Sequence, residues 1–182
     1  GSEAQKTELL PKIASGDLLT ALALEETTHH NPANVAMTAE KSGDGYKLTG
    51  DKRFVIDGHI ADTLILVART GGAAGETQGL SMFLVDAKAK GVTVTRTHMV
   101  DSRNAAMVAL DGVEVSADAA LGSIGGAFAE LENVLDLGRA CLAAEMLGGA
   151  EAVFDTTLEY LKERKQFGVI IGTFQALKHR AA

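Results

Sequence analysis

The hydrophobic pattern of the chain changes its period near residue 127, and this change limits the folds that the chain can adopt. From about Thr20 to Val115, short segments rich in Val, Ile, Leu and Thr are separated by turn sequences such as SGDG, AKAKG and LDG, which is typical of repeated β-strands. After residue 127, the apolar residues that keep to one face of a helix are Leu131, Leu135, Leu142, Met146, Val153, Leu158 and Leu161. The pattern predicts an α+β fold: an antiparallel β-barrel or orthogonal sandwich, then a long α-helix and the start of a second helix.

The same pattern divides the chain into three segments. We expect residues 1–19 to be a lead-in that begins with the remnant of a tag, residues 20–122 to form the β-domain, and residues 123–182 to form a helical part. The GSIGG stretch at residues 122–126 is expected to be a flexible connector, because it lacks the spacing and the strand–helix–strand setting of a dinucleotide fingerprint.

The long helix is expected over about residues 127–166, and the second helix from about residue 173. At about 1.5 Å per residue the first would extend roughly 60 Å, whereas a compact domain of the preceding size is roughly 35 Å across. Its apolar stripe therefore needs a cover from other helices or from another subunit. Gly168 is expected to cap the end of the first helix, and Thr173 the start of the second.

Charge limits the partners of the chain. The formal net charge is −7, which argues against nucleic acid or an anionic membrane as the main partner. No apolar run is long enough to span a bilayer, and no secretory signal is visible, so a cytoplasmic location is expected. The adjacent His29 and His30 are expected in a loop near a ligand rather than at a metal, because neighbouring residues do not aim easily at one ion.

The stretch ERKQFGVIIGTFQALKH, from Glu163 to His179, is similar to the signature R-K-x-F-G-x-P-I-G-x-F-Q of the acyl-CoA dehydrogenases. The segments GDGYKLTGDKRFVIDGHIADTLILVART and GLSMFLVDAKAKGVTV resemble the central β-domain of the same family, and the resemblance covers nearly the whole chain. It implies a fragment of a flavoprotein that uses FAD to oxidise an acyl-CoA thioester to the 2,3-enoyl-CoA. The resemblance also implies electron-transfer flavoprotein as the electron acceptor, a homo-oligomer (dimer or tetramer) for the full-length parent, and an inactive fragment.

The resemblance assigns roles to five polar or aromatic residues near the end of the chain. In the family the motif arginine, here Arg164, meets the FAD diphosphate of a neighbouring subunit, and the residues at Gln166 and Phe167 line the adenosine half. Gln175 matches a glutamine near the same cofactor, and Arg139 matches a helix arginine near the acyl-CoA. A guanidinium binds phosphate through two parallel hydrogen bonds, so this chemistry suits Arg164.

Four residues of the β-domain stand at family ligand positions, and three of them differ from the usual residue. Leu24 replaces a threonine that bonds the flavin ring, and His30 replaces a serine that faces the thioester. Phe54 keeps the aromatic residue beside the flavin, whereas Ile56 replaces a hydroxyl residue. Two lost hydrogen bonds cost about 1 kcal/mol each, so weaker or altered FAD binding is expected.

The resemblance places no catalytic residue in this chain. The family base is a glutamate that most members carry beyond the position of Ala182, and that some carry at the position of Gly138. Two alternatives remain open. One is a non-catalytic partner subunit of an acyl-CoA dehydrogenase-like hetero-oligomer, with weak or no flavin binding. The other is a related flavoenzyme whose substrate is not an acyl-CoA.

Overall fold

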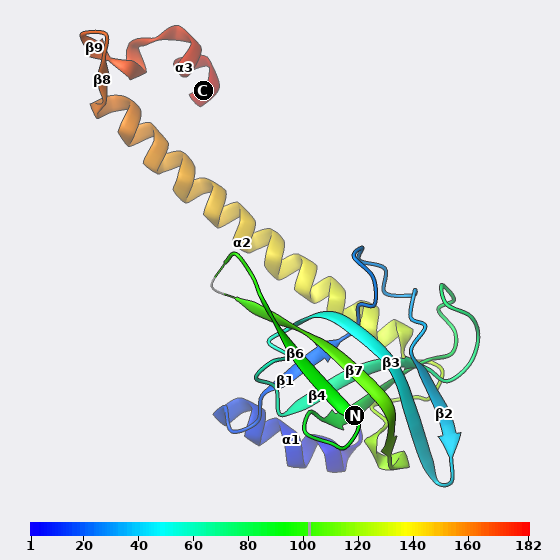
Figure 1. The fold of residues 1–182 in the computed structure, drawn as a ribbon. Helices are drawn as coiled ribbons and strands as arrows, with labels where there is room; N and C mark the ends of the chain where they lie inside the picture. Colours follow the sequence, from blue (N-terminus) through cyan, green and yellow to red (C-terminus); the bar gives the residue numbers. More distant parts are fainter. Residues whose placement is uncertain (102) are drawn as a thin grey trace. The chain divides into compact units, whose positions relative to one another are not determined.

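The chain forms two compact units, Gly1–Glu132 and Asn133–Ala182. The computed structural model describes residues 1–101 and 103–182. The first unit contains a curled β-sheet, and the boundary between the units falls inside the long helix α2, Phe128–Glu163 (Figure 1). The structure therefore has the predicted α+β class.

Seven strands form the sheet of the first unit, in the order β1-β4-β2-β3-β7-β6, with β5 on the other side of β4. The strands are β1 (Thr20–Ala23), β2 (Thr38–Ser42), β3 (Gly45–Ile56), β4 (Thr63–Arg69), β5 (Leu80–Asp86), β6 (Val92–His98) and β7 (Asn104–Val115). The long pairs β3–β7, β6–β7 and β4–β5 are antiparallel, as the predicted barrel or sandwich requires.

Two pairings of β4 are parallel, which the sequence did not indicate. Strand β1 pairs with β4 from Thr20 opposite Thr63 to Ala23 opposite Leu66, and β2 meets β4 at Thr38 opposite Arg69. Parallel neighbours need a crossover connection rather than a tight turn. The connection from β1 to β4 consists of the segment between β1 and β2 and the β2–β3 hairpin. Local composition does not reveal this crossover.

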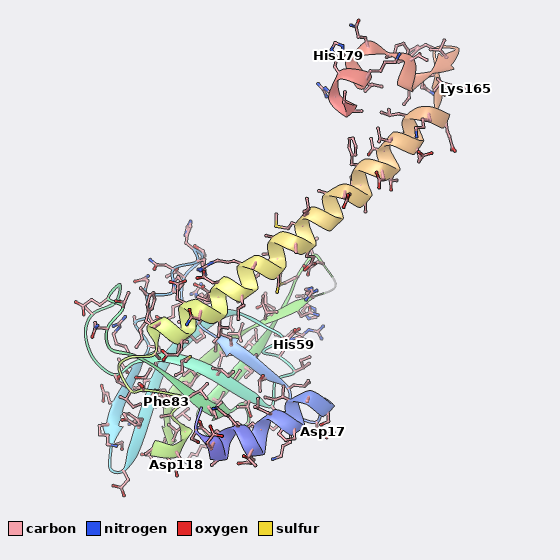
Figure 2. The ribbon with its side chains drawn as sticks, turned by 180° about the vertical axis from the view of Figure 1, so that it is seen from behind. Asp17, His59, Phe83, Asp118, Lys165 and His179 are labelled. Carbon is pink, nitrogen blue, oxygen red and sulfur yellow. The ribbon has the colours of Figure 1, made fainter. Side chains whose placement is uncertain are left out.

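The core of the first unit lies on the inner face of the sheet. Its largest buried apolar side chains include Leu48, Leu64, Leu66, Phe83 and Val108. The Phe83 ring, labelled in Figure 2, lies 5.1 Å from the Tyr46 ring, centroid to centroid. Strands β3 and β7 alternate buried and exposed residues over much of their length, as expected when one face of a sheet is covered.

The GSIGG connector is hydrogen-bonded to the sheet at Gly125, which the sequence did not indicate. The Gly125 amide donates to the Ser81 hydroxyl at 2.8 Å, and the Gly125 carbonyl accepts from the Gly79 amide at 2.8 Å. The Ala127 amide then donates to the Leu80 carbonyl at 3.0 Å. These bonds fix the first turn of α2 on β5, where Leu131 is buried.

The lead-in contains a helix that the sequence analysis did not predict. Helix α1 covers Glu3–Ser15, and Ser2 and Gln5 form a capping box at its start. The Gln5 side chain also donates to the carbonyls of Asp118 and Ala120, at 2.8 and 2.9 Å, beside the short 3₁₀ helix η1 (Ala117–Ala119). These long-range bonds hold α1 against the β-domain.

The second unit holds most of α2, a small hairpin and a short helix. Strands β8 (Lys165–Gln166) and β9 (Val169–Ile170) form the hairpin, followed by η2 (Ile171–Thr173) and α3 (Gln175–Ala181). Along α2, large apolar side chains such as Met146, Leu147 and Val153 are exposed within this single chain.

Both predicted caps near the end of the chain were wrong. Helix α2 ends at Glu163, and Gly168 lies in the β8–β9 turn rather than at the helix end. Both turn residues, Phe167 and Gly168, have positive φ angles of 53° and 78°, which is the pattern of a type I′ hairpin turn. The Thr173 hydroxyl donates to the Ile170 carbonyl, so it does not cap α3.

Candidate functional site

The residues predicted at the flavin ring and the thioester lie on neighbouring parts of the first unit. The Arg53 amide of β3 donates to the Glu25 carbonyl at 2.7 Å, which joins the segment after β1 to the end of β3. This bond places Leu24 and His30, from the first segment, close in the fold to Phe54 and Ile56, from the second. The structure therefore groups these four residues, although about 30 positions separate the two segments in the sequence.

A β-bulge exposes Phe54. The β3–β7 register shifts between Lys52, opposite Val108, and Val55, opposite Ala106, so that β3 carries one residue more than β7. Phe54 adopts a φ of 52°, and its side chain is 53% exposed, while Val55 is buried. A left-handed conformation costs a non-glycine residue roughly 1–2 kcal/mol. Bulges often redirect side chains next to binding sites, and this one turns an aromatic ring outward.

Leu24 and His30 differ in their access to a ligand. The Leu24 side chain is buried, and its carbonyl accepts a hydrogen bond from Lys52. His30 is exposed, and its Nδ1 atom lies 2.5 Å from Oε1 of Glu25. Ile56 is about half exposed, like Phe54. Of these four residues, Phe54 and Ile56 therefore expose apolar side chains, and His30 exposes an imidazole.

Lys52 and Glu26 form an ion pair next to these residues that the sequence did not reveal. The Lys52 ammonium is fully buried and donates to the Leu24 carbonyl at 2.9 Å and to Oε1 of Glu26 at 2.7 Å. Burial lowers the pKa of Lys52 below its usual 10.5, against the opposing attraction of Glu26. One sequence signal could have indicated the burial of Lys52: it lies four residues after Leu48, and so on the same, buried face of β3.

We expect the stabilising contribution of Lys52 to depend on pH. Its folded pKa lies below 10.5, so between the folded value and 10.5 the unfolded chain binds more protons than the folded chain. The contribution should therefore rise with pH in this window, by at most about 1.4 kcal/mol per pH unit, and fall as the pH drops through it. The contribution is measured as the difference in the free energy of unfolding between wild type and Lys52→Met, from urea denaturation between pH 7 and 10.5. A stability difference that shrinks towards alkaline pH would contradict the lowered pKa.

A second buried cation organises two loops of the first unit. Arg69, at the end of β4, donates to five backbone carbonyls at 2.8 to 3.3 Å: those of Ala33, Val35, Gly71, Glu76 and Gln78. These acceptors belong to the segment between β1 and β2 and to the loop between β4 and β5. Arg69 therefore ties together two loops that composition alone presents as independent.

The residues predicted at the FAD diphosphate and adenosine lie on the β8–β9 hairpin of the second unit. Arg164 is exposed and comes directly before β8, and no acceptor within the described residues bonds its guanidinium. Phe167 is 91% exposed at the turn, and its ring meets the Phe174 ring edge-on at a centroid distance of 6.3 Å. The hairpin thus presents one guanidinium with available donors and one uncovered aromatic ring.

The remaining predicted residues lie on the helices of the second unit. Gln175 begins α3, and its amide nitrogen lies 3.3 Å from Nε2 of His179. Arg139 lies on α2 and donates to Asp136 at 2.6 Å. Gln166 is exposed on β8, and its amide donates to the Lys165 carbonyl. The predicted residues thus fall into two groups, one in each unit.

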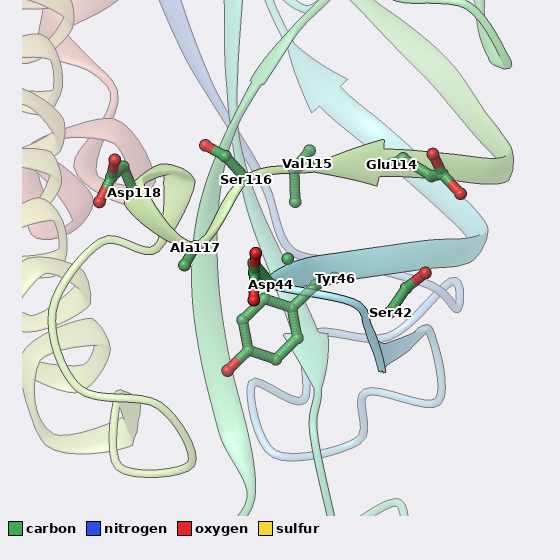
Figure 3. Close-up of a pocket in the computed structure, with 9 residues that line it drawn as sticks. Ser42, Asp44, Tyr46, Glu114, Val115, Ser116, Ala117 and Asp118 are labelled. Carbon is green, nitrogen blue, oxygen red and sulfur yellow. The ribbon is translucent and has the colours of Figure 1, made fainter.

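A surface pocket of about 470 Å³ lies elsewhere on the β-domain. It is lined by the β2–β3 turn, the end of β7 and the start of η1, and its lining residues include the acidic Asp44, Glu114 and Asp118 (Figure 3). None of the predicted ligand residues lines this pocket. Its negative charge would repel a diphosphate, so it is a poor candidate for the FAD site.

Comparison with protein families identifies the two parts of the chain. The acyl-CoA dehydrogenase middle domain matches residues 21–113, and the acyl-CoA dehydrogenase C-terminal domain matches residues 126–182. The chain belongs to the acyl-CoA dehydrogenase family. The resemblance inferred from the sequence is therefore confirmed.

Individual acyl-CoA dehydrogenase relatives agree with this result. The short/branched chain specific acyl-CoA dehydrogenase of Bos taurus is 33% identical over 186 residues, which cover 100% of this chain and 43% of that protein. The caffeyl-CoA reductase-Etf complex subunit CarC of Acetobacterium woodii is 33% identical over 181 residues, which cover 97% of this chain and 48% of that protein. The crystal structure of the acyl-CoA dehydrogenase from Geobacillus kaustophilus has a TM-score of 0.91 and 31% identity, covering 100% of this chain and 49% of that one. The chain spans about half the length of the relatives it matches.

The side chains of this acyl-CoA dehydrogenase chain fit FAD unequally. At the hairpin, an exposed guanidinium and an exposed phenyl ring suit a diphosphate and an adenine. At the other group, Phe54 and Ile56 offer apolar contact, and Leu24 offers no hydroxyl. The residues present therefore fit the cofactor, with the weaker match at the flavin ring.

Among the described residues, no cluster of His, Cys, Asp and Glu side chains could hold a metal ion. No helix in that part of the chain combines the length and the apolar character that crossing a membrane requires.

Proposed function

We propose that this chain is part of an FAD-dependent acyl-CoA dehydrogenase, which oxidises an acyl-CoA thioester to the 2,3-enoyl-CoA. One observation carries the proposal furthest: the RKQFG motif lies on a tight hairpin that leaves the Arg164 guanidinium and the Phe167 ring exposed. A short, rigid turn that presents a cation beside an aromatic ring suits the diphosphate and the adenosine of FAD. Gln166 and Gln175, in the same unit, would supply further polar contacts.

The two groups of residues would serve different ends of the cofactor. Phe54 and Ile56 would cover the flavin ring, and backbone groups near Leu24 would replace the missing hydroxyl. His30 would meet the thioester from the exposed loop, and Arg139 would lie near the acyl-CoA. In the oligomer that we propose for the parent protein, the hairpin would bind the FAD held by a neighbouring subunit.

Bound FAD would supply the hydride acceptor, and the chain's own residues would bind and orient the ligands. Removal of the α-proton needs a carboxylate beside the reacting carbon. The helix position that carries this base in some relatives is Gly138 here, so this chain supplies no proton acceptor at that position.

We propose electron-transfer flavoprotein as the partner that receives the electrons and the cytoplasm as the location. One relative, a subunit of a caffeyl-CoA reductase-Etf complex, supports this partner.

The experiment that tests this proposal is a spectroscopic titration of the purified full-length protein. We expect a yellow protein whose flavin absorption is bleached when an acyl-CoA is added without an electron acceptor. A protein that takes up FAD and stays yellow with every acyl-CoA in a panel of chain lengths would contradict the substrate class.

The variant Arg164→Ala tests the hairpin in the same titration. Loss of a charge-assisted contact is worth about 1.5–3 kcal/mol, so the dissociation constant for FAD should rise roughly 10- to 100-fold. Lys162→Ala is the matched control, because Lys162 is also exposed and cationic but already pairs with Glu159. Equal affinities for wild type and Arg164→Ala would refute the role of Arg164.

One observation favours a second candidate, a non-catalytic partner subunit. The buried side chain of Leu24 and the aliphatic side chain of Ile56 offer the flavin ring no hydroxyl. The same titration separates the two functions, because a folded full-length protein that stays colourless after FAD is added would be the partner subunit.

A further inference from the structure

The pair of the buried Lys52 and the partly buried Glu26 lies between the two segments that carry the flavin-side residues. Lys52 is two residues before Phe54, and Glu26 is two residues after Leu24 and four before His30. The Lys52 ammonium contacts both the Leu24 carbonyl and the Glu26 carboxylate. Each segment is therefore held by a group that lies next to its proposed ligand residues.

Glu26 also closes the loop that carries His30. Its Oε2 atom accepts from the Ala36 amide at 2.7 Å, and its Oε1 atom accepts from the Met37 amide at 3.0 Å. The carboxylate thus joins the two ends of the segment of residues 27–35, which we call the imidazole loop. With its ends held together, this segment is an Ω-type loop, a kind of loop that is frequently functional. Its tip, from Thr27 to Asn31, is exposed.

The same contacts hold the bulge at Phe54. Lys52 bonds to residues 24 and 26, and the amide of its neighbour Arg53 bonds to the carbonyl of Glu25 between them. Three consecutive residues after β1 are therefore bonded to two consecutive residues of β3. The unfavourable φ of Phe54 persists because these bonds fix the backbone immediately before it.

A charge pair with a fully buried lysine is an unexpected way to stabilise a sheet. Removing two charged groups from water is costly, and apolar residues in the same volume often stabilise a core equally well. An apolar pair would not fix the local geometry in the same way. The directed hydrogen bonds of Lys52 and Glu26 determine the positions of the two ends of the imidazole loop and of the Phe54 bulge.

We propose that Lys52 and Glu26 are positioning residues, which hold the imidazole loop and the Phe54 bulge in the arrangement that binds the flavin end of FAD; this rests on the proposed function. Neither side chain contacts the ligand. They act through Phe54, Leu24 and His30, whose places they fix.

The test compares Lys52→Met with Val85→Ala in the full-length protein. Val85 is buried in β5 opposite Leu64, so its truncation loosens the core away from the ion pair. We expect the dissociation constant for FAD to rise at least tenfold in Lys52→Met and to stay within twofold of wild type in Val85→Ala. The shape of the visible absorption band of bound flavin should also change only in Lys52→Met. Equal FAD affinities and spectra for the two variants would overturn the proposal.

Hydrogen exchange gives a readout that is independent of FAD. The Ala36 and Met37 amides, which bond to Glu26, should exchange at least tenfold faster in Lys52→Met than in Val85→Ala, and equal rates would overturn the proposal. If Lys52→Met does not fold, Glu26→Gln serves instead, because it keeps the side-chain volume and one acceptor oxygen. Unchanged FAD affinity and unchanged exchange of the Ala36 and Met37 amides in Glu26→Gln would also overturn the proposal.

The outcomes distinguish this inference from the proposed function. A wild-type protein that folds but binds no FAD refutes the proposed function, and this inference with it. A wild-type protein that binds FAD, combined with a Lys52→Met affinity equal to that of Val85→Ala, refutes only the positioning role.

Discussion

Replacement of Arg69 by methionine is expected to lower the free energy of unfolding by about 4 kcal/mol. The guanidinium donates to five backbone carbonyls in two loops. Hydrogen bonds that involve a charged group are worth about 1.5–3 kcal/mol each, but such bonds are not additive, and single substitutions rarely cost more than 4–5 kcal/mol. Methionine keeps much of the apolar volume and removes every donor. Urea denaturation followed by circular dichroism measures the loss.

Arg96→Met is the matched control for Arg69→Met. Arg96 is an exposed arginine on β6, so its replacement should change stability by no more than about 0.5 kcal/mol. If the two variants lost the same stability, the five carbonyl contacts of Arg69 would be irrelevant to folding. We also expect faster proteolysis within residues 70–79 in Arg69→Met alone, because this loop loses its buried anchor.

Replacement of Gly79 by alanine is expected to cost about 3 kcal/mol or more. Gly79 has a φ of 82°, where a side chain is strained by roughly 1–2 kcal/mol. A Cβ atom there would also clash with the backbone carbonyl of Gly71. Relief of such a clash shifts the backbone at the start of β5, and overpacking of this kind costs about 1–3 kcal/mol more. Thermal unfolding and urea denaturation both report this change.

Gly75→Ala separates the two causes in the Gly79 prediction. Gly75 lies in the same loop with a φ of 95°, and a Cβ atom there would meet no atom within 4 Å. Its replacement should therefore cost only the backbone strain, about 1–2 kcal/mol. If the two alanine variants lost the same free energy of unfolding, the close approach of the Gly71 carbonyl to Gly79 would add nothing to the cost of Gly79→Ala.

Much of the architecture could be predicted because it follows from local pattern. The strand segments, the long helix and the α+β class come from the periodicity of apolar residues, which each segment carries within itself. The RKQFG motif indicated the family in the same way, because its residues are contiguous. The FAD and acyl-CoA roles of the predicted site residues remain predictions that the titrations above address.

Other features could not be predicted because they depend on distant partners. The parallel β1–β4 pair joins segments about 40 residues apart, and nothing in a short window encodes which strands become neighbours. Gly168 fits a helix cap as well as it fits a hairpin turn by composition, and the pairing of Gln166 with Val169 decided for the turn. Helix α1 docks through Gln5 on residues more than 110 positions away.

The sequence by itself therefore determined the class of the fold and the family. It predicts, through the family motif, which residues would face the ligand. Only the tertiary structure decided that Lys52 and Arg69 are buried. It also decided that Lys52 links the imidazole loop to the Phe54 bulge and that Arg69 joins two loops. The physical reason is that a charged residue in a strand is usually exposed. Its burial is tolerated only when acceptors from elsewhere in the chain surround it, and those acceptors come together only when the chain folds.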